Sequence, residues 1–528
     1  MQPVEFENEL THLTHRQQDT LEDFHSRYEA AVERVRQDLG QSHPLRIDGE
    51  AVETAESFTV RNPGALEEVI GEFAAGKPDH VESAVETAID SFDEWRHMAP
   101  EKRADIFREA AEIMRDRKFE LAAVMTLENG KNRTEAVADV DEAIDFLRFY
   151  AEEFDRHDGY RFDTGEPTPT ESTTNMLRPY GVFGVVAPFN FPLAILTGMT
   201  TGALITGNTV VVKPASATPL IAHRFFDVLD DAGLPAGVAN LVTGGGSDVG
   251  QPITEHPDVD GVVFTGSREV GLDIQRTFLE EGKRGPVIAE LGGKNPVIVS
   301  ESADLDKAVN GVLMGAFSFS GQKCSATSRV YVHEDHYDTF TERLVEATAD
   351  LTVGPPEELE TVISPIIDDA SVDRYDRIVS LAAEDGTIPT GGEHVERADL
   401  PDGRYVAPTV VTDIPHEHEL ATEEHFLPFV TVHEYSDFDE ALALANDSDY
   451  GLCAGLFSED EAEIETWFDR IESGMCYVNR KSSATTGALV QAQPFGGWKF
   501  SGTTGRFAGG YWYLPQFMRE QSRTLVEE

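Results

Sequence analysis

The sequence predicts an α/β protein made of more than one domain. Segments with helical spacing, at about 219–232 and 269–281, lie between short runs that are rich in β-branched residues. Strands that alternate with helices in this way predict a parallel sheet with right-handed crossovers. The chain has 528 residues, which is more than one hydrophobic core usually serves, so we expect two or three domains. The runs that predict strands are 182–187, 209–213, 261–265 and 287–289.

The rest of the chain continues the same pattern. Residues 8–40 are charged and predict a helical appendage, and residues 330–477 repeat the alternation of strand and helix, which predicts a second sheet domain. Helices whose apolar residues form one stripe are expected at 81–95, 100–127, 135–156 and 305–317.

Composition excludes several classes of protein. No apolar run reaches the roughly 18 residues that a membrane span requires. Residues 1–9 are polar and acidic and lack the regions of a secretory signal, so we expect a cytoplasmic location. The three cysteines are too few for a disulfide framework in a chain of this length. Residues 416–425 contain three histidines without a recognised metal spacing, so we expect no metal site.

The net charge of -54 is extreme, and the acidic residues are dispersed along the chain. Such a field repels nucleic acid and anionic lipid, so neither is an expected partner. A dense acidic surface suits a cytoplasm of high salt, where the Debye length falls to about 3 Å at 1 M. We therefore interpret the charge as the adaptation of a halophile. Full activity and unchanged circular dichroism in dilute buffer would contradict this interpretation.

Three polar residues in separate segments have the chemistry of covalent catalysis on a carbonyl. Cys324 can become a thiolate nucleophile, and Glu290, at the end of an apolar run, can act as a general base. Asn190 supplies an amide donor for an oxyanion. Taken singly, a lone cysteine is more often an inert buried thiol and a lone glutamate a solvated carboxylate. Their joint occurrence predicts an active site.

Two further segments indicate a nucleotide site. Residues 264–271 follow a predicted strand and open a helix, so that the backbone N–H groups near Gly266 could hold a pyrophosphate. Lys213 ends another predicted strand, where cofactors bind in doubly wound sheets. The spacing is GxxxxG and not GxGxxG, so an ordinary strand-to-helix turn and a surface lysine remain open alternatives.

Over roughly residues 45–520 the chain resembles NAD(P)-dependent aldehyde dehydrogenases. The motifs that carry the resemblance follow the family's order: Pro188-Phe189-Asn190-Phe191-Pro192, Lys213-Pro214-Ala215, Phe264-Thr265-Gly266-Ser267, Glu290-Leu291-Gly292-Gly293-Lys294, Gly321-Gln322-Lys323-Cys324 and Pro494-Phe495-Gly496-Gly497.

The resemblance implies an aldehyde dehydrogenase-like fold. Residues 1–44 would be an N-terminal helical extension. A homo-oligomer, either a dimer or a multiple of dimers, is also implied. The rest of the chain would form three regions: a Rossmann-like coenzyme-binding domain (45–160 and 180–291), an α/β catalytic domain (292–494) and a small β oligomerisation element (161–179 and 505–524).

The resemblance also assigns roles in the reaction. Cys324 would attack the aldehyde carbon, and the Asn190 amide and the backbone N–H of Cys324 would hold the oxyanion. After hydride leaves for the nicotinamide, Glu290 would activate water to release the acid from a thioester. The residues that it places around the coenzyme are Pro188, Lys213, Ser216, Gly266, Ser267, Gly271, Glu424 and Phe426.

Three positions depart from the family pattern. Ser216 stands where many NAD-preferring members carry Glu, so a 2′-phosphate would not be repelled. NAD is the expected coenzyme, and NADP is a possible one. Phe189 replaces a common Trp, and Leu427 a usual Gly three residues after Glu424.

Four segments narrow the resemblance within the family: residues 321–326, 479–490, 501–503 and 508–510. They most resemble those of the 1-pyrroline-5-carboxylate dehydrogenases, which oxidise L-glutamate 5-semialdehyde to glutamate in proline degradation. This resemblance implies that Ser325 and the backbone of Gly487 and Ala488 bind the substrate's α-carboxylate. Phe191 or Phe495 would form an apolar wall, unless they are simply core residues. The alternatives are another small semialdehyde such as succinate semialdehyde, a CoA-acylating enzyme, and an inactive coenzyme-binding protein.

Overall fold

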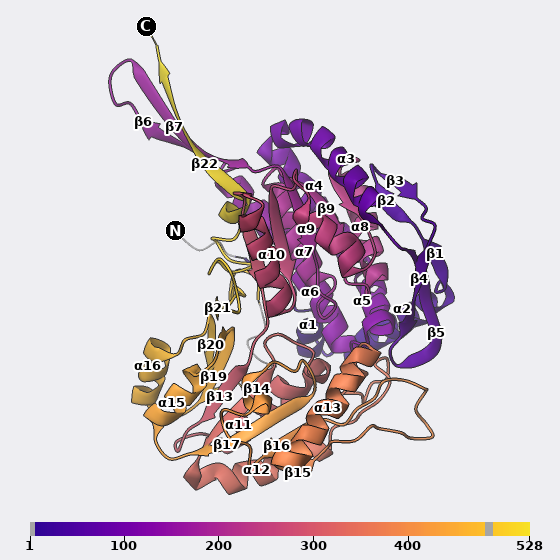
Figure 1. Ribbon diagram of the computed structural model, residues 1–528, viewed down its shortest axis with the longest axis vertical. Helices are drawn as coiled ribbons and strands as arrows, with labels where there is room; N and C mark the ends of the chain where they lie inside the picture. Colours follow the sequence, from indigo (N-terminus) through magenta and orange to yellow (C-terminus); the bar gives the residue numbers. More distant parts are fainter. Residues whose placement is uncertain (1–5, 481–488, 528) are drawn as a thin grey trace.

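The computed structural model describes residues 6–480 and 489–527. Two seven-stranded sheets, each with helices on both faces, occupy opposite ends of the molecule (Figure 1). The first has the strand order β12-β11-β8-β9-β10-β2-β3. Its parallel strands confirm the predicted sheet, and β2 (Leu45–Ile47) and β3 (Glu50–Val52) add an antiparallel edge. The parallel strands are β8 (Val182–Val186), β9 (Thr209–Lys213), β10 (Ala239–Leu241), β11 (Gly261–Thr265) and β12 (Val287–Glu290).

Side-chain alternation along β9 divides the hydrophobic core of this end in two. Val210 and Val212 face one layer of helices, and Val211 faces the other. The first layer contains α4 (Pro100–Asp116), α5 (Lys118–Asn129), α6 (Arg133–Arg156), α7 (Ala194–Ile205) and α8 (Pro219–Asp231). The second contains α3 (Pro78–His97), α9 (Gln251–Glu255) and α10 (Arg268–Glu280).

One predicted helix is divided in the structure, and the predicted helical appendage contains two helices. The helix expected at 100–127 is two helices that meet at Arg117, because α4 buries one face whereas α5 is buried along its whole length. The appendage expected at 8–40 is α1 (Thr11–Gln17) and α2 (Leu21–Gln37), with Asp19 at a positive φ of 57° between them. A small sheet of β1 (Gln41–His43), β5 (Ala65–Ala74) and β4 (Ser57–Asn62) follows.

The second sheet confirms the other predicted α/β region. One face packs on α11 (Leu305–Phe317) and α12 (Glu334–Ala349), and the other on α15 (Phe438–Asn446) and α16 (Glu461–Arg470). Helices α13 (Asp369–Asp385) and α14 (Glu419–Thr422) pack near one edge. The strands, in spatial order, are β15 (Thr387–Thr390), β16 (Thr409–Thr412), β17 (Phe429–Tyr435), β14 (Thr327–His333), β13 (Asn295–Val299), β19 (Cys453–Phe457) and β20 (Met475–Val478).

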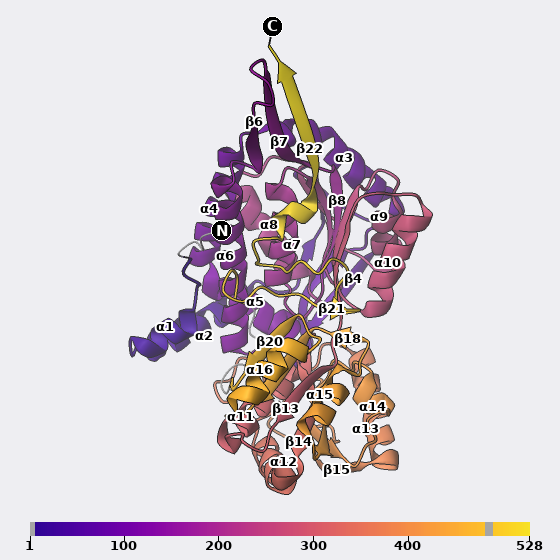
Figure 2. The ribbon, with the colours of Figure 1, turned by 90° about the vertical axis from the view of Figure 1, so that its left-hand side faces the viewer.

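The C-terminal segment returns from the second sheet to the first. Strand β21 (Trp498–Lys499) pairs with β18 (Tyr450–Gly451), and residues 501–503 then bond to β12. Finally β22 (Met518–Val526) pairs with β7 (Glu171–Pro179), which also pairs with β6 (Arg161–Gly165). These three strands form an arm that projects from the body (Figures 1 and 2). Within residues 6–480 and 489–527, no helix is long and apolar enough to span a bilayer.

Candidate active site

Parallel pairing brings the predicted coenzyme residues to one edge of the first sheet. Val186 lies beside Lys213 on one neighbour and beside Phe264 on the other, and Thr265 lies beside Glu290. The chain runs outward from β8 to β10 and returns to β11 on the other side of β8. The strand order therefore reverses between β8 and β11, and open α/β sheets bind nucleotides at such a point.

The coenzyme residues at this edge are held by local contacts. The Lys213 ammonium group is buried and donates to the Pro214 carbonyl oxygen at 2.9 Å, and burial lowers the pKa of Lys213 to about 8. Ser267 begins α10, and its hydroxyl oxygen accepts the Val270 N–H at 3.4 Å. A β-carbon at Gly271 would overlap the Leu291 side chain, so glycine there lets α10 pack closely on the chain after β12.

Open space adjoins the backbone beyond this sheet edge. A β-carbon at Gly245 or Gly246 would meet no atom within 4 Å. The exposed Ser216 donates to the Gly244 carbonyl oxygen at 3.0 Å, and Pro188 is partly exposed after β8. Open backbone beside a buried lysine and the start of α10 fits a group that carries phosphates and sugars.

The thiol lies in a backbone turn that few residues adopt. Phe319, Ser320 and Gly321 have consecutive positive φ angles of 48°, 53° and 65°. Such a conformation at the two non-glycine residues costs about 1–3 kcal/mol each, so the surroundings must enforce it. A β-carbon at Gly321 would overlap the Leu427 carbonyl group, which requires glycine at that position.

Asn295 fixes the chain on the other side of the thiol. Its amide nitrogen donates to the Cys324 and Ala326 carbonyl oxygens, both at 2.8 Å. Its amide oxygen accepts the Cys453 N–H at 3.0 Å. One side chain at the start of β13 therefore holds the thiol loop against β19, and Cys324 as a whole residue is partly exposed.

Glu290 ends β12 and enters the space in front of this loop. The Gly497 N–H bonds to its carboxyl group, but its Oε2 atom is buried without a partner in the described part of the chain. Burial raises the pKa of Glu290 well above its ordinary value. The backbone of Ser501 and Thr503 pairs with the end of β12 and the residue after it. Leu291 donates its N–H to the Ser501 carbonyl oxygen at 2.9 Å, and Thr503 donates its N–H to the Ala289 carbonyl oxygen at 3.1 Å.

Glu424 approaches the same space from the segment after α14. Its Oε1 atom accepts the Gly293 N–H at 2.9 Å, and a β-carbon at Gly292 would overlap its carboxylate. Burial raises the pKa of Glu424 to about 7, against the opposing effects of the Gly293 N–H, Lys294 and Arg374. The adjoining Phe426 has a positive φ of 59°, and its ring lies 5.8 Å from that of Phe189.

Both carboxyl groups act on the thiol. Burial, and then the negative charges of Glu424 and Glu290, raise the pKa of Cys324, whereas the backbone N–H groups of Ser325 and Cys324 oppose the rise. The thiol is therefore protonated at rest, and a base must remove its proton before it can act as a nucleophile. Because the electrostatic effect of a charge falls with distance, the effect of Glu290 and Glu424 on the Cys324 pKa indicates that both carboxyl groups lie near the sulfur.

Buried polar groups support the segment that contains Asn190. The Asn129 amide donates to the Phe189 carbonyl oxygen at 3.1 Å. Lys131 forms an ion pair of 2.6 Å with Asp139, and both side chains are buried. Its ammonium group lies 3.6 Å from the centre of the Phe191 ring and 5.1 Å from that of Phe319.

Lys131 thus contacts both segments that carry the predicted catalytic residues. Phe191 adjoins Asn190, and Phe319 belongs to the turn before Cys324. Asp139 also accepts the Ala194 N–H at 2.7 Å, at the start of α7. The segments that carry Asn190 and Cys324 therefore contact the same buried cation.

The predicted substrate residues lie on both sides of this region. Ser325 is buried beside the thiol, Phe191 packs on the first core, and Phe495 packs on the second. The backbone of Phe495 pairs with that of Ala508 through bonds of 2.8 and 2.9 Å. Gly487 and Ala488 lie outside the described residues.

Sequence reasoning missed the residues that support the site. No role was expected for Lys131, Asp139, Asn129 or Asn295, and the only signal was that polar residues interrupt buried apolar segments. No cluster of three or more metal-ligating side chains occurs within the parts of the chain that the structure describes.

Comparisons with known proteins agree with this geometry. The aldehyde dehydrogenase family model matches residues 51–522. The chain is 42% identical over 508 residues to the 1-pyrroline-5-carboxylate dehydrogenase of Bacillus cytotoxicus, which covers 95% of this chain and 96% of that protein.

Solved structures give the same result. A 1-pyrroline-5-carboxylate dehydrogenase from Thermus with bound NAD superposes with a TM-score of 0.92 at 37% identity, and all of both chains is covered. The betaine aldehyde dehydrogenase of Staphylococcus aureus with NAD+ gives a TM-score of 0.87 at 31% identity over 93% of this chain and 96% of that one. With the thiol, the two carboxyl groups and the amide in family order, the chain belongs to the aldehyde dehydrogenase family.

Proposed function

We propose that this enzyme oxidises L-glutamate 5-semialdehyde to L-glutamate with NAD, as a step in proline degradation. The observation that carries the proposal is the similarity to 1-pyrroline-5-carboxylate dehydrogenases over nearly the whole of both chains. Conversion of an aldehyde into an acid needs a nucleophile, an oxyanion site and a base for water. Cys324, Asn190 and Glu290 supply these three groups.

Cys324 begins the reaction as the nucleophile. The thiol first gives its proton to water. The sulfur then forms a bond to the aldehyde carbon as the carbonyl π electrons move to oxygen, and the negative charge on oxygen is held by the Asn190 amide and the backbone N–H of Cys324. Loss of one such donor typically costs about 2.7–4 kcal/mol of transition-state stabilisation. The buried contacts of Lys131 and Asn129 around this segment favour a preorganised amide.

NAD, when bound, supplies the acceptor for the hydride that leaves the aldehyde carbon. Lys213, Ser267 and Gly266 would hold its phosphates and ribose, and Glu424 and Phe426 would contact its nicotinamide end. Pro188 would line the same crevice, and Gly271 would support it by close packing. Ser216 places no carboxylate against a 2′-phosphate, which leaves NADP as a second coenzyme.

Glu290 completes the reaction as the general base. Its carboxylate accepts a proton from water, the water oxygen attacks the thioester carbonyl, and the acid leaves as the sulfur recovers its proton. A buried oxygen without a partner in the described chain suits this task, because it can bond to that water. A CoA-acylating enzyme would not need this carboxylate.

The α-carboxylate of the substrate would bind to neutral donors. Ser325 and the backbone of Gly487 and Ala488 can hold it without a buried cation. Phe191 and Phe495 would flank the carbon chain. We further propose a cytoplasmic homo-oligomer, a dimer or a multiple of dimers, that assembles through β6, β7 and β22.

Steady-state kinetics at high salt test the proposal. We expect kcat/KM to be highest for glutamate semialdehyde, lower for succinate semialdehyde and lowest for propanal, with NAD preferred and no requirement for CoA. A preference for succinate semialdehyde would contradict the assigned substrate. Dependence on CoA would contradict hydrolysis by Glu290.

A further inference from the structure

The amide donor and the thiol are carried by different sheets. Asn190 follows β8 of the first sheet, and Cys324 precedes β14 of the second. Their spacing therefore depends on contacts that cross between the two halves of the molecule. Helix α6 makes such contacts with both segments through Glu135 and Asp139, which lie four residues apart and hence on one face of the helix.

Asp139 holds the segment of the amide. Its carboxylate pairs with Lys131 at 2.6 Å and accepts two backbone N–H groups at the start of α7, which follows the amide. The Lys131 ammonium group lies over the ring of Phe191, the residue directly after Asn190. The segment of the amide is therefore fixed to α6 both by backbone hydrogen bonds and by a buried cation.

Glu135 holds the segment of the thiol. Its Oε1 atom accepts a hydrogen bond of 3.0 Å from the ammonium group of Lys323, the residue directly before Cys324. Both side chains are mostly buried, with exposed fractions of 10% for Lys323 and 18% for Glu135. Lys131 adds a second contact with this segment, because it lies 5.1 Å from the centre of the Phe319 ring in the turn before the thiol.

Lys131, Asp139, Glu135 and Lys323 form one network, here called the α6 charge network. Burial lowers the pKa of Lys131, Asp139 and Glu135 oppose this effect, and Lys323 adds to it. The two ion pairs therefore lie close enough to act on each other. Removal of one partner from a buried pair leaves an uncompensated charge, so each pair resists opening.

We propose that the residues of the α6 charge network are positioning residues, which set the distance from the Cys324 sulfur to the Asn190 amide. The network then determines how strongly the amide stabilises the oxyanion. This inference deepens the proposed function and rests on the roles assigned there to Cys324 and Asn190. Because the oxyanion forms on every aldehyde, the network should affect substrates with and without an α-carboxylate alike.

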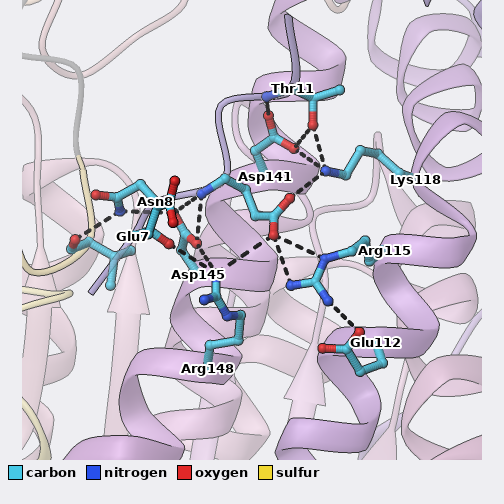
Figure 3. Close-up of polar contacts among 11 residues, drawn as sticks. Glu7, Asn8, Thr11, Glu112, Arg115, Lys118, Asp141, Asp145 and Arg148 are labelled. Atoms are coloured by element: carbon cyan, nitrogen blue, oxygen red, sulfur yellow. Dashed lines mark hydrogen bonds and ion pairs between the residues drawn. The ribbon is translucent and has the colours of Figure 1, made fainter. Parts of the chain in front are cut away.

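A matched ion pair on another face of α6 supplies the control. Asp141 lies two residues after Asp139 and so about 200° around the helix. Lys118 contacts it at 2.7 Å, and both side chains are buried (Figure 3). Asp141 also accepts the backbone N–H and the hydroxyl of Thr11, each at 2.8 Å. Without its lysine each aspartate would keep two donors, but Asp141 holds the N-terminal segment and Asp139 the segment of the amide.

The rate of NADH formation in the first turnover, at saturating NAD, tests the inference. Misplacement of a reacting group by about 1 Å can cost about a hundredfold in rate, so we expect Lys131→Met to lower this rate by about tenfold to a hundredfold. Glu135→Gln, which weakens the bond to Lys323, should lower it by about threefold to tenfold. The factor should be the same for glutamate semialdehyde and propanal, with KM for NAD unchanged. Lys118→Met should lower the midpoint of thermal unfolding, as Lys131→Met does, but keep the wild-type rate.

A double-mutant cycle with Asn190→Ala separates positioning from general damage. Once the amide is absent it cannot be misplaced, so Lys131→Met should lower the rate of the Asn190→Ala enzyme by less than about twofold. If Lys131→Met does not fold, Glu135→Gln takes its place in the same cycle. Persistence of the full effect in the Asn190→Ala enzyme, an equal loss in Lys118→Met, or a wild-type rate in Glu135→Gln would overturn the inference. If Asn190→Ala itself kept the wild-type rate, the oxyanion role in the proposed function would fail, and the inference would fail with it.

Discussion

Glu290 and Glu424 both lie near the thiol, and their surroundings differ. Glu424 is fixed by the Gly293 N–H, with Lys294 and Arg374 acting on it electrostatically. Glu290 receives the Gly497 N–H and keeps a buried oxygen without a partner in the described chain. A carboxyl group with a free oxygen can take a proton from water, whereas a fixed one is suited to orient a ligand. The surroundings of each glutamate, and not its residue type, therefore determine whether it acts as a base or as a binding group.

The largest effect is expected when Glu290 loses its basicity. Glu290→Gln keeps the size of the side chain but cannot accept a proton from water, so we expect the steady-state rate to fall by about a hundredfold or more. The first turnover should still yield NADH, which rapid mixing would record as a burst. An equal fall in the burst rate and the steady-state rate would show that Glu290 also serves the acylation step.

A smaller effect is expected at Glu424. Glu424→Gln keeps the bond from the Gly293 N–H but removes the charge, so we expect KM for NAD to rise by about tenfold, because charge-assisted hydrogen bonds are lost. The burst and the steady-state rate at saturating NAD should fall together and only a few-fold. Accumulation of acyl-enzyme in this variant would reverse the roles assigned to the two glutamates.

The smallest effect is expected from pH. Burial raises the pKa of both groups, so each carboxyl is protonated at low pH and gains its charge as pH rises. The wild-type steady-state rate should therefore rise with pH over the range in which the enzyme stays folded, as Glu290 becomes able to accept a proton. Affinity for NAD should rise a few-fold as pH passes about 7, where Glu424 ionises. A rate that fell as pH rose over this range would contradict the assignment of Glu290 as the base.

Much of the fold could be predicted from local pattern. Strands β9 and β11 have the bounds that were expected, because both faces of these strands are buried and their sequences are therefore nearly continuous apolar runs. The break at Arg117 could not be predicted, since α4 and α5 are both helical in pattern and only their packing partners separate them. The same holds for the turn at Asp19.

The residues of the site could likewise be predicted only where they stand in motifs. Cys324, Glu290 and Glu424 stand in motifs, so their chemistry could be predicted. The ion pair of Lys131 with Asp139 could not, because nothing in the sequence indicates that the two lie beside Phe191. Adaptation to high salt stays a prediction from the charge of -54.

The central claim is that Cys324 carries the acyl group that water later releases with the help of Glu290. Mass spectrometry of Glu290→Gln enzyme, quenched after mixing with glutamate semialdehyde and NAD, tests it most directly. We predict one acyl group per active site, on the peptide that contains Cys324, and none in the Cys324→Ala enzyme. Full turnover by Cys324→Ala, or an acyl group on Cys453 or Cys476 instead, would contradict the account.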